Sequence, residues 1–270
     1  MKYAFMSFSC PDASLADMLS LAQEFGYDGI EPRTGGIHAH GVELDTGAVD
    51  RKRMLDAARG RGVAFGCIAV GSRFADPAVT EASLVEAEAG IRLARDLESG
   101  IVRVFGGKLA EGGDRGDAIK RVAASLRSLA PLAHDCGVTV CFETHDDWCD
   151  PAHVATVMEE VNHPSIGVNW DVMHPVRNHL ASMEESFQIL RPWIRHVHIH
   201  DGMHNPDTLE FRAFGEGEYD LDTVFRSLLT EGYNGYLSGE WINWEAARTH
   251  LPREIERMRA FETDLSEALS

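Results

Sequence analysis

Short apolar runs alternate with amphipathic stretches along the whole chain. The runs are rich in β-branched and aromatic residues, which is typical of strands, and the stretches between them have helical periodicity. The pattern predicts eight strands, over residues 3–8, 29–32, 63–70, 101–105, 138–143, 166–171, 196–200 and 236–240. A strand–helix unit is therefore expected to repeat eight times.

The predicted helices have start and stop signals. Ser14 and Ser182 are each followed three residues later by an acidic residue, which is the spacing of a capping box. Asp76 and Asp150 each precede a proline, so both offer an N-cap with proline at the first helical position. Glycines stand where helices should stop, at positions 26, 62, 100, 137 and 232. These signals support the alternation of strand and helix.

Strict alternation implies parallel strands joined by helical crossovers. Eight units in 270 residues favour one closed (β/α)8 barrel, the TIM barrel, over an open sheet. No linker rich in proline, serine or charge divides the chain, so residues 1–270 are assigned to one α/β domain. The segments 33–48 and 201–219 are long for barrel loops and follow strand carboxyl ends, so they should lie over the active face.

Four successive strands end in an ionisable side chain. These residues are Glu143, Asp171, His198 and Glu240. The carboxyl ends of barrel strands converge around one mouth, where three carboxylates would repel each other without a cation. Oxygen-rich ligation with one nitrogen suits Mn²⁺ in the first place, with Mg²⁺, Co²⁺ or Zn²⁺ as alternatives. The pattern predicts one divalent metal ion, although each residue taken singly could be a solvated strand end.

Other histidines should surround this mouth. Because strand side chains alternate between faces, His196 and His200 share the face of His198. His196 should lie deeper, as a core histidine or a group that supports a ligand. His200 should lie at the mouth, as a substrate contact or proton shuttle, or simply be exposed. His145 shares the face of Glu143 and is a similar candidate.

Two further segments could bind an anion. Arg33 follows the second strand and could hold a substrate carboxylate or phosphate. The alternative is a structural role for this strand end, in which Glu31 forms a salt bridge across the mouth. Residues 106–108, Gly-Gly-Lys, could cradle an anion with backbone N–H groups or could form a plain turn.

The net charge of −18 narrows the classes of binding partner expected for this chain. Only 25 basic residues stand against 43 acidic ones, which argues against nucleic acid and against membrane surfaces as partners. No signal peptide and no membrane-spanning run is expected. The five cysteines show no paired spacing, which suggests reduced thiols and a cytoplasmic location. Association into a homo-oligomer is left open.

The chain resembles the xylose isomerase-like TIM barrels, which include sugar phosphate isomerases and epimerases, with inosose and dehydroshikimate dehydratases as relatives. The resemblance covers nearly the whole chain and is strongest from residue 143 to residue 240. It rests on Glu143, the Asp171-x-x-His174 motif, His196-Val197-His198, Gly215-Glu216-Gly217 and Glu240. It implies a small-molecule carbohydrate or cyclic polyol as substrate.

The resemblance also implies roles for single residues. Glu143, Asp171, His198 and Glu240 would bind one divalent ion, and the two glutamates would also act as acid and base. His174 would contact substrate, as would Arg212 in the loop after the seventh strand, although its spacing from His198 is not that of the epimerases.

Proton abstraction next to a carbonyl, through a metal-stabilised enediolate, fits this set of residues. The first interpretation is therefore a metal-dependent isomerase or epimerase of a sugar- or polyol-derived ketone. A dehydratase of an inosose- or dehydroshikimate-like ketone shares the first step and is the alternative. A phosphodiesterase of the abasic-site endonuclease type would need more metal ligands and a DNA-attracting surface. A non-enzymatic binding barrel is the fourth interpretation.

Overall fold

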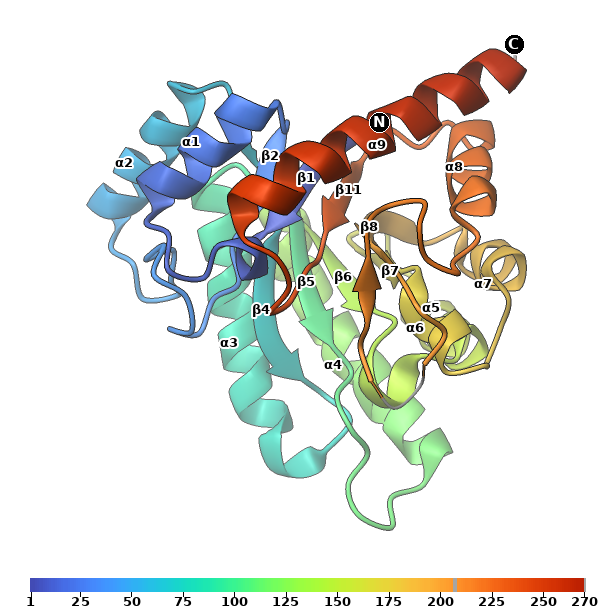
Figure 1. The fold of residues 1–270 in the computed structure, drawn as a ribbon. Helices are drawn as coiled ribbons and strands as arrows, with labels where there is room; N and C mark the ends of the chain where they lie inside the picture. The colour runs from blue at the N-terminus through green and yellow to red at the C-terminus, as the bar shows by residue number, and fades with distance from the viewer. Residues whose placement is uncertain (206–207, 270) are drawn as a thin grey trace.

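One curved parallel sheet surrounds the centre of the protein in the computed structural model, which describes residues 1–205 and 208–269. Its strands lie in the order β3 (Ala64–Phe65), β2 (Gly29–Glu31), β1 (Lys2–Met6), β11 (Tyr236–Gly239), β8 (Ile194–Ile199), β7 (Ile166–Asp171), β6 (Thr139–Glu143), β5 (Ile101–Phe105) and β4 (Ile68–Arg73). The strand nearest the start of the chain, β1, thus pairs with β11, the last along the chain. Strands β4 and β5 run downwards in Figure 1.

The barrel closes where one predicted strand is interrupted. Strands β3 and β4 both come from the segment 63–70, but they are separated at residues 66–67. Strand β3 pairs with β2 and β4 pairs with β5. The Ala69 N–H donates to the Pro32 carbonyl at 3.0 Å, which joins the end of β2 to β4. The interruption coincides with Gly66, where a Cβ would lie 3.2 Å from the Tyr236 ring. The eight-unit TIM barrel is therefore confirmed.

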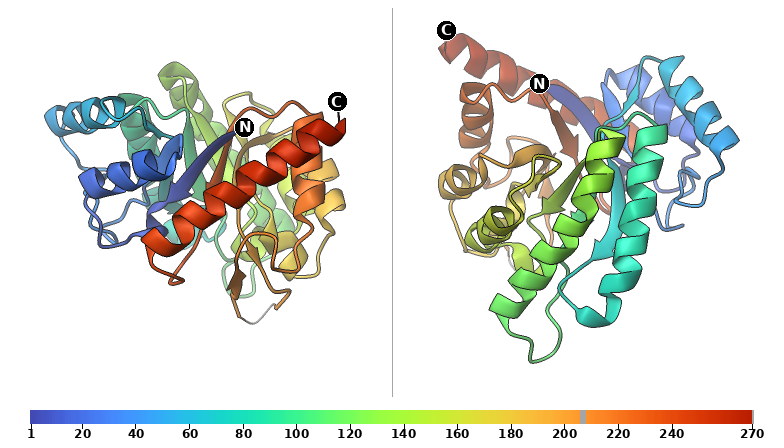
Figure 2. Two further views of the ribbon diagram at one scale, coloured as in Figure 1. Left: turned by 45° about the horizontal axis from the view of Figure 1, so that its top comes forward. Right: turned by 180° about the vertical axis from the view of Figure 1, so that it is seen from behind.

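Helices cover the outside of this barrel (Figures 1 and 2). They are α1 (Leu15–Phe25), α2 (Ala48–Arg59), α3 (Pro77–Asp96), α4 (Arg115–Cys136), α5 (Pro151–Val161), the short α6 (Met173–Arg177), α7 (Met183–Leu190), α8 (Leu221–Thr230) and α9 (Ala247–Leu269). The four predicted N-caps all accept a backbone N–H, and Ser182 with Glu185 forms a complete capping box. None of the described helices is both long and apolar enough to cross a bilayer.

The long loop after β8 contains a small antiparallel ribbon that its sequence did not indicate. The ribbon pairs β9 (Asp201–Gly202) with β10 (Phe211–Arg212). The Asp201 carboxylate accepts the N–H groups of Gly215 and Gly217 at 2.8 and 2.9 Å. Residue 217 must be glycine there, because a Cβ would lie 2.1 Å from the Asp201 Oδ1. Residues 206–207 of the predicted loop lie outside the described residues.

Alternation along the strands separates an apolar layer from a polar barrel interior. On β7, Val168 and Trp170 face the helices, and the Trp170 indole N–H donates to the Ser186 hydroxyl on α7 at 2.9 Å. The alternate residues of the strand, Asn169 and Asp171, face the opposite way and are fully buried. The same alternation places buried polar side chains inside the barrel from β5, β6, β8 and β11. The barrel therefore presents its polar groups to its own centre, near the carboxyl ends of the strands.

Candidate metal centre

The four predicted metal-binding residues meet at the carboxyl ends of their strands. Glu143 and Asp171 are the last residues of β6 and β7, His198 is the penultimate residue of β8, and Glu240 follows β11. One potential ligand atom from each lies within 4.8 Å of the others. Three of the residues are at most 1% exposed and Glu240 is 8% exposed. The fold thus gathers three carboxylates and one imidazole in a buried cluster, which we call the four-residue cluster.

His198 lies at the centre of this cluster. Its Nδ1 is 2.7 Å from the Glu143 Oε1 and 3.2 Å from the Glu240 Oε2. Burial lowers the pKa of His198, but Glu31, Glu143 and Glu240 outweigh it, so the pKa lies well above its ordinary value. In this arrangement the imidazolium supplies the positive charge that the carboxylates require. A divalent cation in place of the proton on Nδ1 would supply more positive charge.

Within the described part of the chain, two carboxylate oxygens of the cluster lack a hydrogen-bond donor. The Asp171 Oδ1 accepts the N–H groups of Met173 and His174 at 2.9 and 3.2 Å, while its Oδ2 is buried without a hydrogen bond. The Glu143 Oε2 is also buried without one and has only the Arg103 guanidinium beside it, at 3.3 Å. Buried acceptors without partners are unfavourable. Because the donor set is oxygen-rich with one nitrogen, these residues fit a divalent cation.

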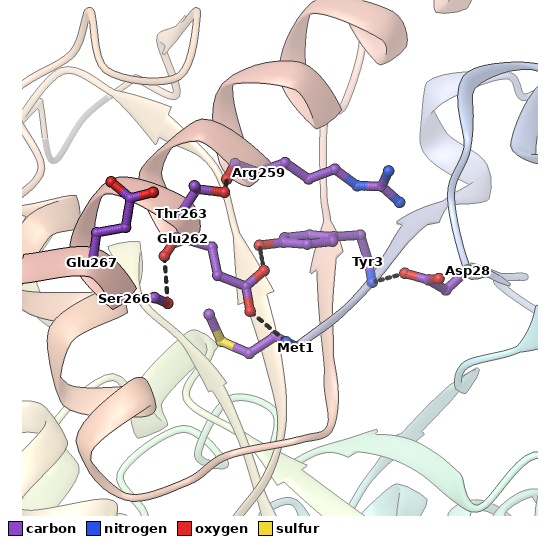
Figure 3. Close-up of a pocket in the computed structure, with 8 residues that line it drawn as sticks. All are labelled: Met1, Tyr3, Asp28, Arg259, Glu262, Thr263, Ser266 and Glu267. Carbon is purple, nitrogen blue, oxygen red and sulfur yellow. Dashed lines mark hydrogen bonds and ion pairs between the residues drawn. The ribbon is translucent and has the colours of Figure 1, made fainter. Parts of the chain in front are cut away.

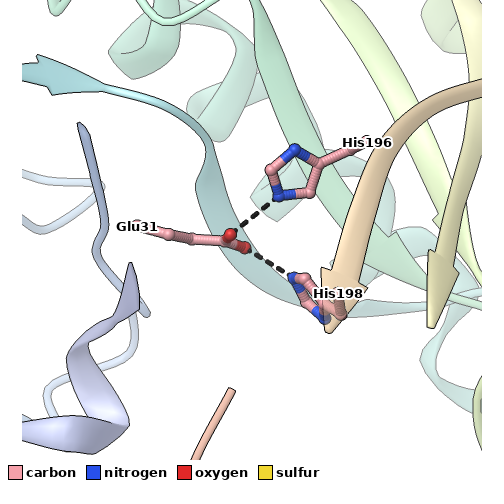
Figure 4. A group of neighbouring side chains, drawn as sticks. All are labelled: Glu31, His196 and His198. Carbon is pink, nitrogen blue, oxygen red and sulfur yellow. Dashed lines mark hydrogen bonds and ion pairs between the residues drawn. The ribbon is translucent and has the colours of Figure 1, made fainter. Parts of the chain in front are cut away.

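Glu31 supports the cluster from the second strand. Its Oε1 is 3.0 Å from the His198 Nε2 and its Oε2 is 2.8 Å from the His196 Nε2, so its carboxylate lies between the two rings (Figure 4). Burial raises the pKa of Glu31, but the two histidines outweigh it and the pKa lies well below its ordinary value. An anionic Glu31 keeps a proton on the Nε2 of His198 and leaves Nδ1 facing the cluster. The buried position of His196 agrees with its predicted place deeper in the barrel.

Arg103 is a site residue that the sequence analysis missed. It lies on β5 between Val102 and Val104, is 1% exposed, and has its guanidinium carbon 4.0 Å from the centroid of the Phe105 ring. Burial lowers the pKa of Arg103, but Glu143 and the other interior carboxylates raise it above its ordinary value. An arginine at an inward position of an otherwise apolar strand was the signal that could have found it.

Three histidines lie together beside Asp171. The His174 Nε2 is 3.8 Å from the Asp171 Oδ2, and the His200 Nε2 is 3.6 Å from the Asp171 Oδ1. The His145 and His174 rings meet edge to face, with centroids 4.6 Å apart. Burial lowers the pKa of His174. For His145 burial acts in the same direction, but the hydrogen bond to Asp146 and the charge of Glu143 outweigh it and raise the pKa.

The two predicted arginines lie in different settings. Arg33 lines a cavity of about 410 Å³ that also contains Asp146, the neighbour of His145. Arg212 is exposed on β10 and forms an ion pair with Glu210 at 3.3 Å. Its described contacts do not include the four-residue cluster.

A larger hollow, of about 570 Å³, lies at the opposite end of the barrel, where β1 and β2 begin (Figure 3). Its polar groups bond to one another. The Tyr3 hydroxyl donates to the Glu262 Oε2 at 2.6 Å, and the amino group of Met1 is 2.5 Å from the Glu262 Oε1. The Tyr3 N–H donates to Asp28 at 2.8 Å. Bonds of this kind join the last helix to the first strand, which is a structural role.

A closed (β/α)8 barrel with a buried acidic and histidine cluster at its strand carboxyl ends has the architecture of a TIM-barrel enzyme. The family model described as "Xylose isomerase-like TIM barrel" matches residues 19–261, so the chain belongs to this family. The resemblance noted from the sequence motifs is thereby confirmed.

Relatives of this chain include enzymes of two reaction classes. A 3-dehydroshikimate dehydratase from Bacillus anthracis is 26% identical over 203 residues, which cover 74% of this chain and 71% of the relative. A fructoselysine 3-epimerase from Shigella flexneri is 24% identical over 251 residues, which cover 88% and 90%. The solved structure of an L-ribulose 3-epimerase has a TM-score of 0.82 at 21% identity, with 100% and 97% of the chains covered. The chain is therefore an enzyme, and its relatives are epimerases and a dehydratase.

Proposed function

We propose that this chain is a divalent-metal-dependent isomerase or epimerase that moves a proton on the carbon next to a ketone of a sugar or polyol. The observation that carries the proposal is the buried four-residue cluster, in which carboxylates from β6 and β11 flank one imidazole. Relatives named fructoselysine 3-epimerase and L-ribulose-5-phosphate 3-epimerase support it.

Glu143, Asp171, His198 and Glu240 would hold the ion, with Mn²⁺ as the preferred metal. A bound divalent ion polarises a ketone and a neighbouring hydroxyl, and so makes the carbon-bound proton more acidic. Arg103 acts in the same direction as the ion, because its guanidinium lies 3.3 Å from the Glu143 carboxylate and favours negative charge at the site.

Glu143 and Glu240 are the proposed proton carriers. Their strands are separated in the sheet by β7 and β8, so the two carboxylates can approach a substrate from different sides. Burial raises the pKa of Glu240, but the charge and hydrogen bond of His198 and the charge of Arg103 outweigh it and keep the pKa below its ordinary value. One carboxylate would take the proton from carbon and the other would return one to the opposite face. A weakly basic Glu240 requires a substrate that is already acidified.

The residues around the cluster are proposed substrate contacts. His174 and His200 lie within 4 Å of Asp171, and His145 packs against His174. The His200 Nδ1 faces the Glu240 carbonyl at 3.1 Å, and its Nε2, 3.6 Å from the Asp171 Oδ1, has no hydrogen bond among the described residues and would meet a substrate hydroxyl. Arg33 would meet a part of the substrate that lies farther from the ion. Arg212 would first have to leave Glu210, so its proposed contact with substrate depends on movement of its side chain.

A dehydratase acting on an inosose- or dehydroshikimate-like ketone is the second candidate. The relative named 3-dehydroshikimate dehydratase favours it. The same proton abstraction would begin the reaction, and loss of the β-hydroxyl as water would complete it. Incubation with 3-dehydroshikimate separates the two candidates, because loss of water extends conjugation and gives an ultraviolet-absorbing product, whereas epimerisation does not.

Proton exchange tests the proposal directly. A screen of ketoses and cyclic ketones with Mn²⁺ identifies a working substrate, which is then followed by proton NMR in D₂O. The wild type should place deuterium next to the carbonyl. Glu143→Gln and Glu240→Gln keep the side-chain size but remove the base, so each should reduce turnover by roughly 10²–10⁴-fold. Glu98→Gln, at an exposed position far from the mouth, serves as the matched control.

Metal content must be measured on the same samples. Loss of exchange with the metal retained supports the acid–base roles. Wild-type exchange rates in both variants with metal bound would contradict them, and the base would then be sought at His145, His174 or His200. Failure of every ketone in the screen to exchange would contradict the isomerase proposal itself.

A further inference from the structure

Three basic side chains line the cavity beside the four-residue cluster. Arg33 follows β2, Arg73 ends β4, and Lys108 lies after β5, so all three come from the carboxyl ends of neighbouring strands. The cavity has a volume of about 410 Å³. This volume falls in the usual range of small-molecule sites, roughly 300–1,000 Å³.

None of these three cations forms an ion pair with a carboxylate of the described residues. The Arg33 guanidinium donates to the Thr34 carbonyl, and the described side-chain contacts of Arg73 and Lys108 include no hydrogen bond. Three cations without an ion pair among the described residues therefore face one cavity.

The acidic residues that line the same cavity are engaged elsewhere. Asp76 caps α3 by accepting the Ala78 N–H at 2.9 Å. Glu86 accepts the Ser72 hydroxyl at 2.9 Å, and Asp146 lies 3.3 Å from the His145 Nδ1. Each carboxylate thus has a nearer partner than the three cations, although the charge of Glu86 still acts on Arg33 and that of Asp146 on Arg73 and Lys108. The cations keep N–H groups without an ion-pair partner among the described residues, and these are available to a ligand.

Two glycines make room for the arginines. A Cβ at Gly71 would lie 2.9 Å from the Arg33 Nη2. Gly107 has φ +77°, and a Cβ there would lie 2.7 Å from the Cβ of Arg73. Burial and the charge of Arg103 lower the pKa of Arg33 to about 10, which still leaves it charged at neutral pH. The cavity is thus shaped around charged guanidinium groups.

A chain of side-chain contacts links the cavity wall to the proposed catalytic centre. Asp146 on its wall is 3.3 Å from His145, whose ring lies 4.6 Å from that of His174. His174 in turn is 3.8 Å from the Asp171 carboxylate. The charge of Glu143 also acts on the Arg33 guanidinium, so the cluster and the cations lie close enough for one substrate to span them.

We infer that the substrate carries an anionic group, a phosphate monoester or a carboxylate, which binds Arg33, Arg73 and Lys108 while the ketone lies at the four-residue cluster. The identification of the bound anion as part of the substrate rests on the proposed function. The anion site itself rests only on the cavity. Guanidinium groups bind both anions through paired N–H donors, and lysine adds a point charge.

Direct binding tests the anion site without any activity. Inorganic phosphate and, separately, acetate are titrated by calorimetry into chelator-treated protein, so that an ion in the four-residue cluster cannot bind them. We expect phosphate, acetate or both to bind the wild type. The double variant Arg73→Gln/Lys108→Gln should weaken that binding by about tenfold or more, because charge-assisted hydrogen bonds are lost. Gly71→Ala changes no charge and should weaken it by displacing Arg33.

The matched control removes the same charge from exposed helices. Lys52→Gln/Lys120→Gln alters side chains that are 75% and 72% exposed, on α2 and α4, and should leave anion binding unchanged. An equal loss in this control would reduce the effect to general electrostatics and overturn the inference. Absence of binding by both anions to the wild type would also overturn it, as would undiminished binding to the Arg73→Gln/Lys108→Gln variant.

A substrate comparison then distinguishes the two anions and separates this inference from the proposed function. The ratio of kcat/KM for a phosphorylated ketose over its unphosphorylated form should fall in Arg73→Gln/Lys108→Gln if phosphate is the natural group. If only the kcat/KM ratio of a carboxylated cyclic ketone over its neutral analogue falls, the natural anionic group is a carboxylate. No change in either ratio would overturn the substrate assignment. If the protein binds anions but exchanges no ketone proton, the anion site stands and the proposed reaction is rejected.

Discussion

The two ends of the barrel treat their carboxylates in opposite ways. Where β1 and β2 begin, the Glu262 carboxylate has a bond on each oxygen, one from Tyr3 and one from the amino group of Met1. Where β6 and β7 end, Glu143 and Asp171 each keep a buried oxygen without a hydrogen bond. Both ends contain carboxylates, but only one end is internally satisfied.

The difference agrees with a structural role for the amino ends of the strands and with the chemistry proposed for their carboxyl ends. Satisfied groups lower the free energy of the folded state, whereas incompletely bonded groups raise it unless a ligand completes them. The hollow at the amino ends is larger, about 570 Å³ against about 410 Å³, yet it contains no such incomplete cluster among the described residues. Volume alone would have selected the wrong end as the candidate site.

Asp171→Asn should produce the largest effect. It preserves the side-chain shape and an oxygen that can accept the Met173 and His174 N–H groups, but it removes a charge from the four-residue cluster. We expect turnover near background and no stabilisation by Mn²⁺. In the wild type, Mn²⁺ at a hundredfold excess over its Kd should add about 2.7 kcal/mol to the free energy of unfolding. That gain should raise the Tm by several degrees.

Thermal melts of both proteins, with chelator and with added Mn²⁺, measure this effect. An equal Mn²⁺-induced shift in Asp171→Asn and wild type would show that the ion binds elsewhere. The chelated variant should be at least as stable as the chelated wild type, because one of three clustered carboxylates loses its charge.

Glu31→Gln should produce an intermediate effect. Glu31 contacts the Nε2 atoms of His196 and His198, on the side of His198 that faces away from the other three members of the cluster. Replacing a carboxylate that orients a ligand typically reduces metal affinity or activity by about 10–100-fold. Competition calorimetry with Mn²⁺ measures the affinity, and saturating Mn²⁺ should restore most of the turnover. Unchanged affinity would assign Glu31 to barrel packing alone.

Tyr3→Phe should produce the smallest effect on function and a clear effect on stability. It removes the hydroxyl that donates to Glu262 at 2.6 Å. Loss of a hydrogen bond to a charged group should lower the free energy of unfolding by about 1.5–3 kcal/mol. Urea unfolding measures this change, while Mn²⁺ affinity and turnover should match the wild type. A change in turnover with stability preserved would connect the two ends of the barrel functionally and break the comparison.

Periodicity was sufficient to predict the fold because each strand is a separate apolar run between recognisable helix signals. The clustering of the four predicted site residues was predictable for a related reason. Barrel strands end around one mouth, so an ionisable residue at a strand end has a known neighbourhood. The positions of Glu143 and Asp171 could be predicted once the strand ends were known, and β6 and β7 end at the residues predicted from the sequence.

Features that depend on contacts distant in sequence were not predicted. The interruption at Gly66 depends on the Tyr236 ring, which lies 170 positions later in the chain. The β9–β10 ribbon is accompanied by Asp201 binding the backbone of Gly215 and Gly217. Arg73 was missed because β4 continues past the predicted end at residue 70, with an irregular register between Ala69 and Arg73.

The pairing of β1 with β11 has a consequence for synthesis on the ribosome. Strand β1 is made first, and β11 is completed only when residue 239 has been added. Until then the growing sheet has an open edge beside β1, and unpaired edges of incomplete sheets promote aggregation. Helix α9, which also joins the two termini through Glu262, follows later still. A nascent chain that stalls before β11 should therefore depend on chaperones, even though most of its helices and strands have already been made.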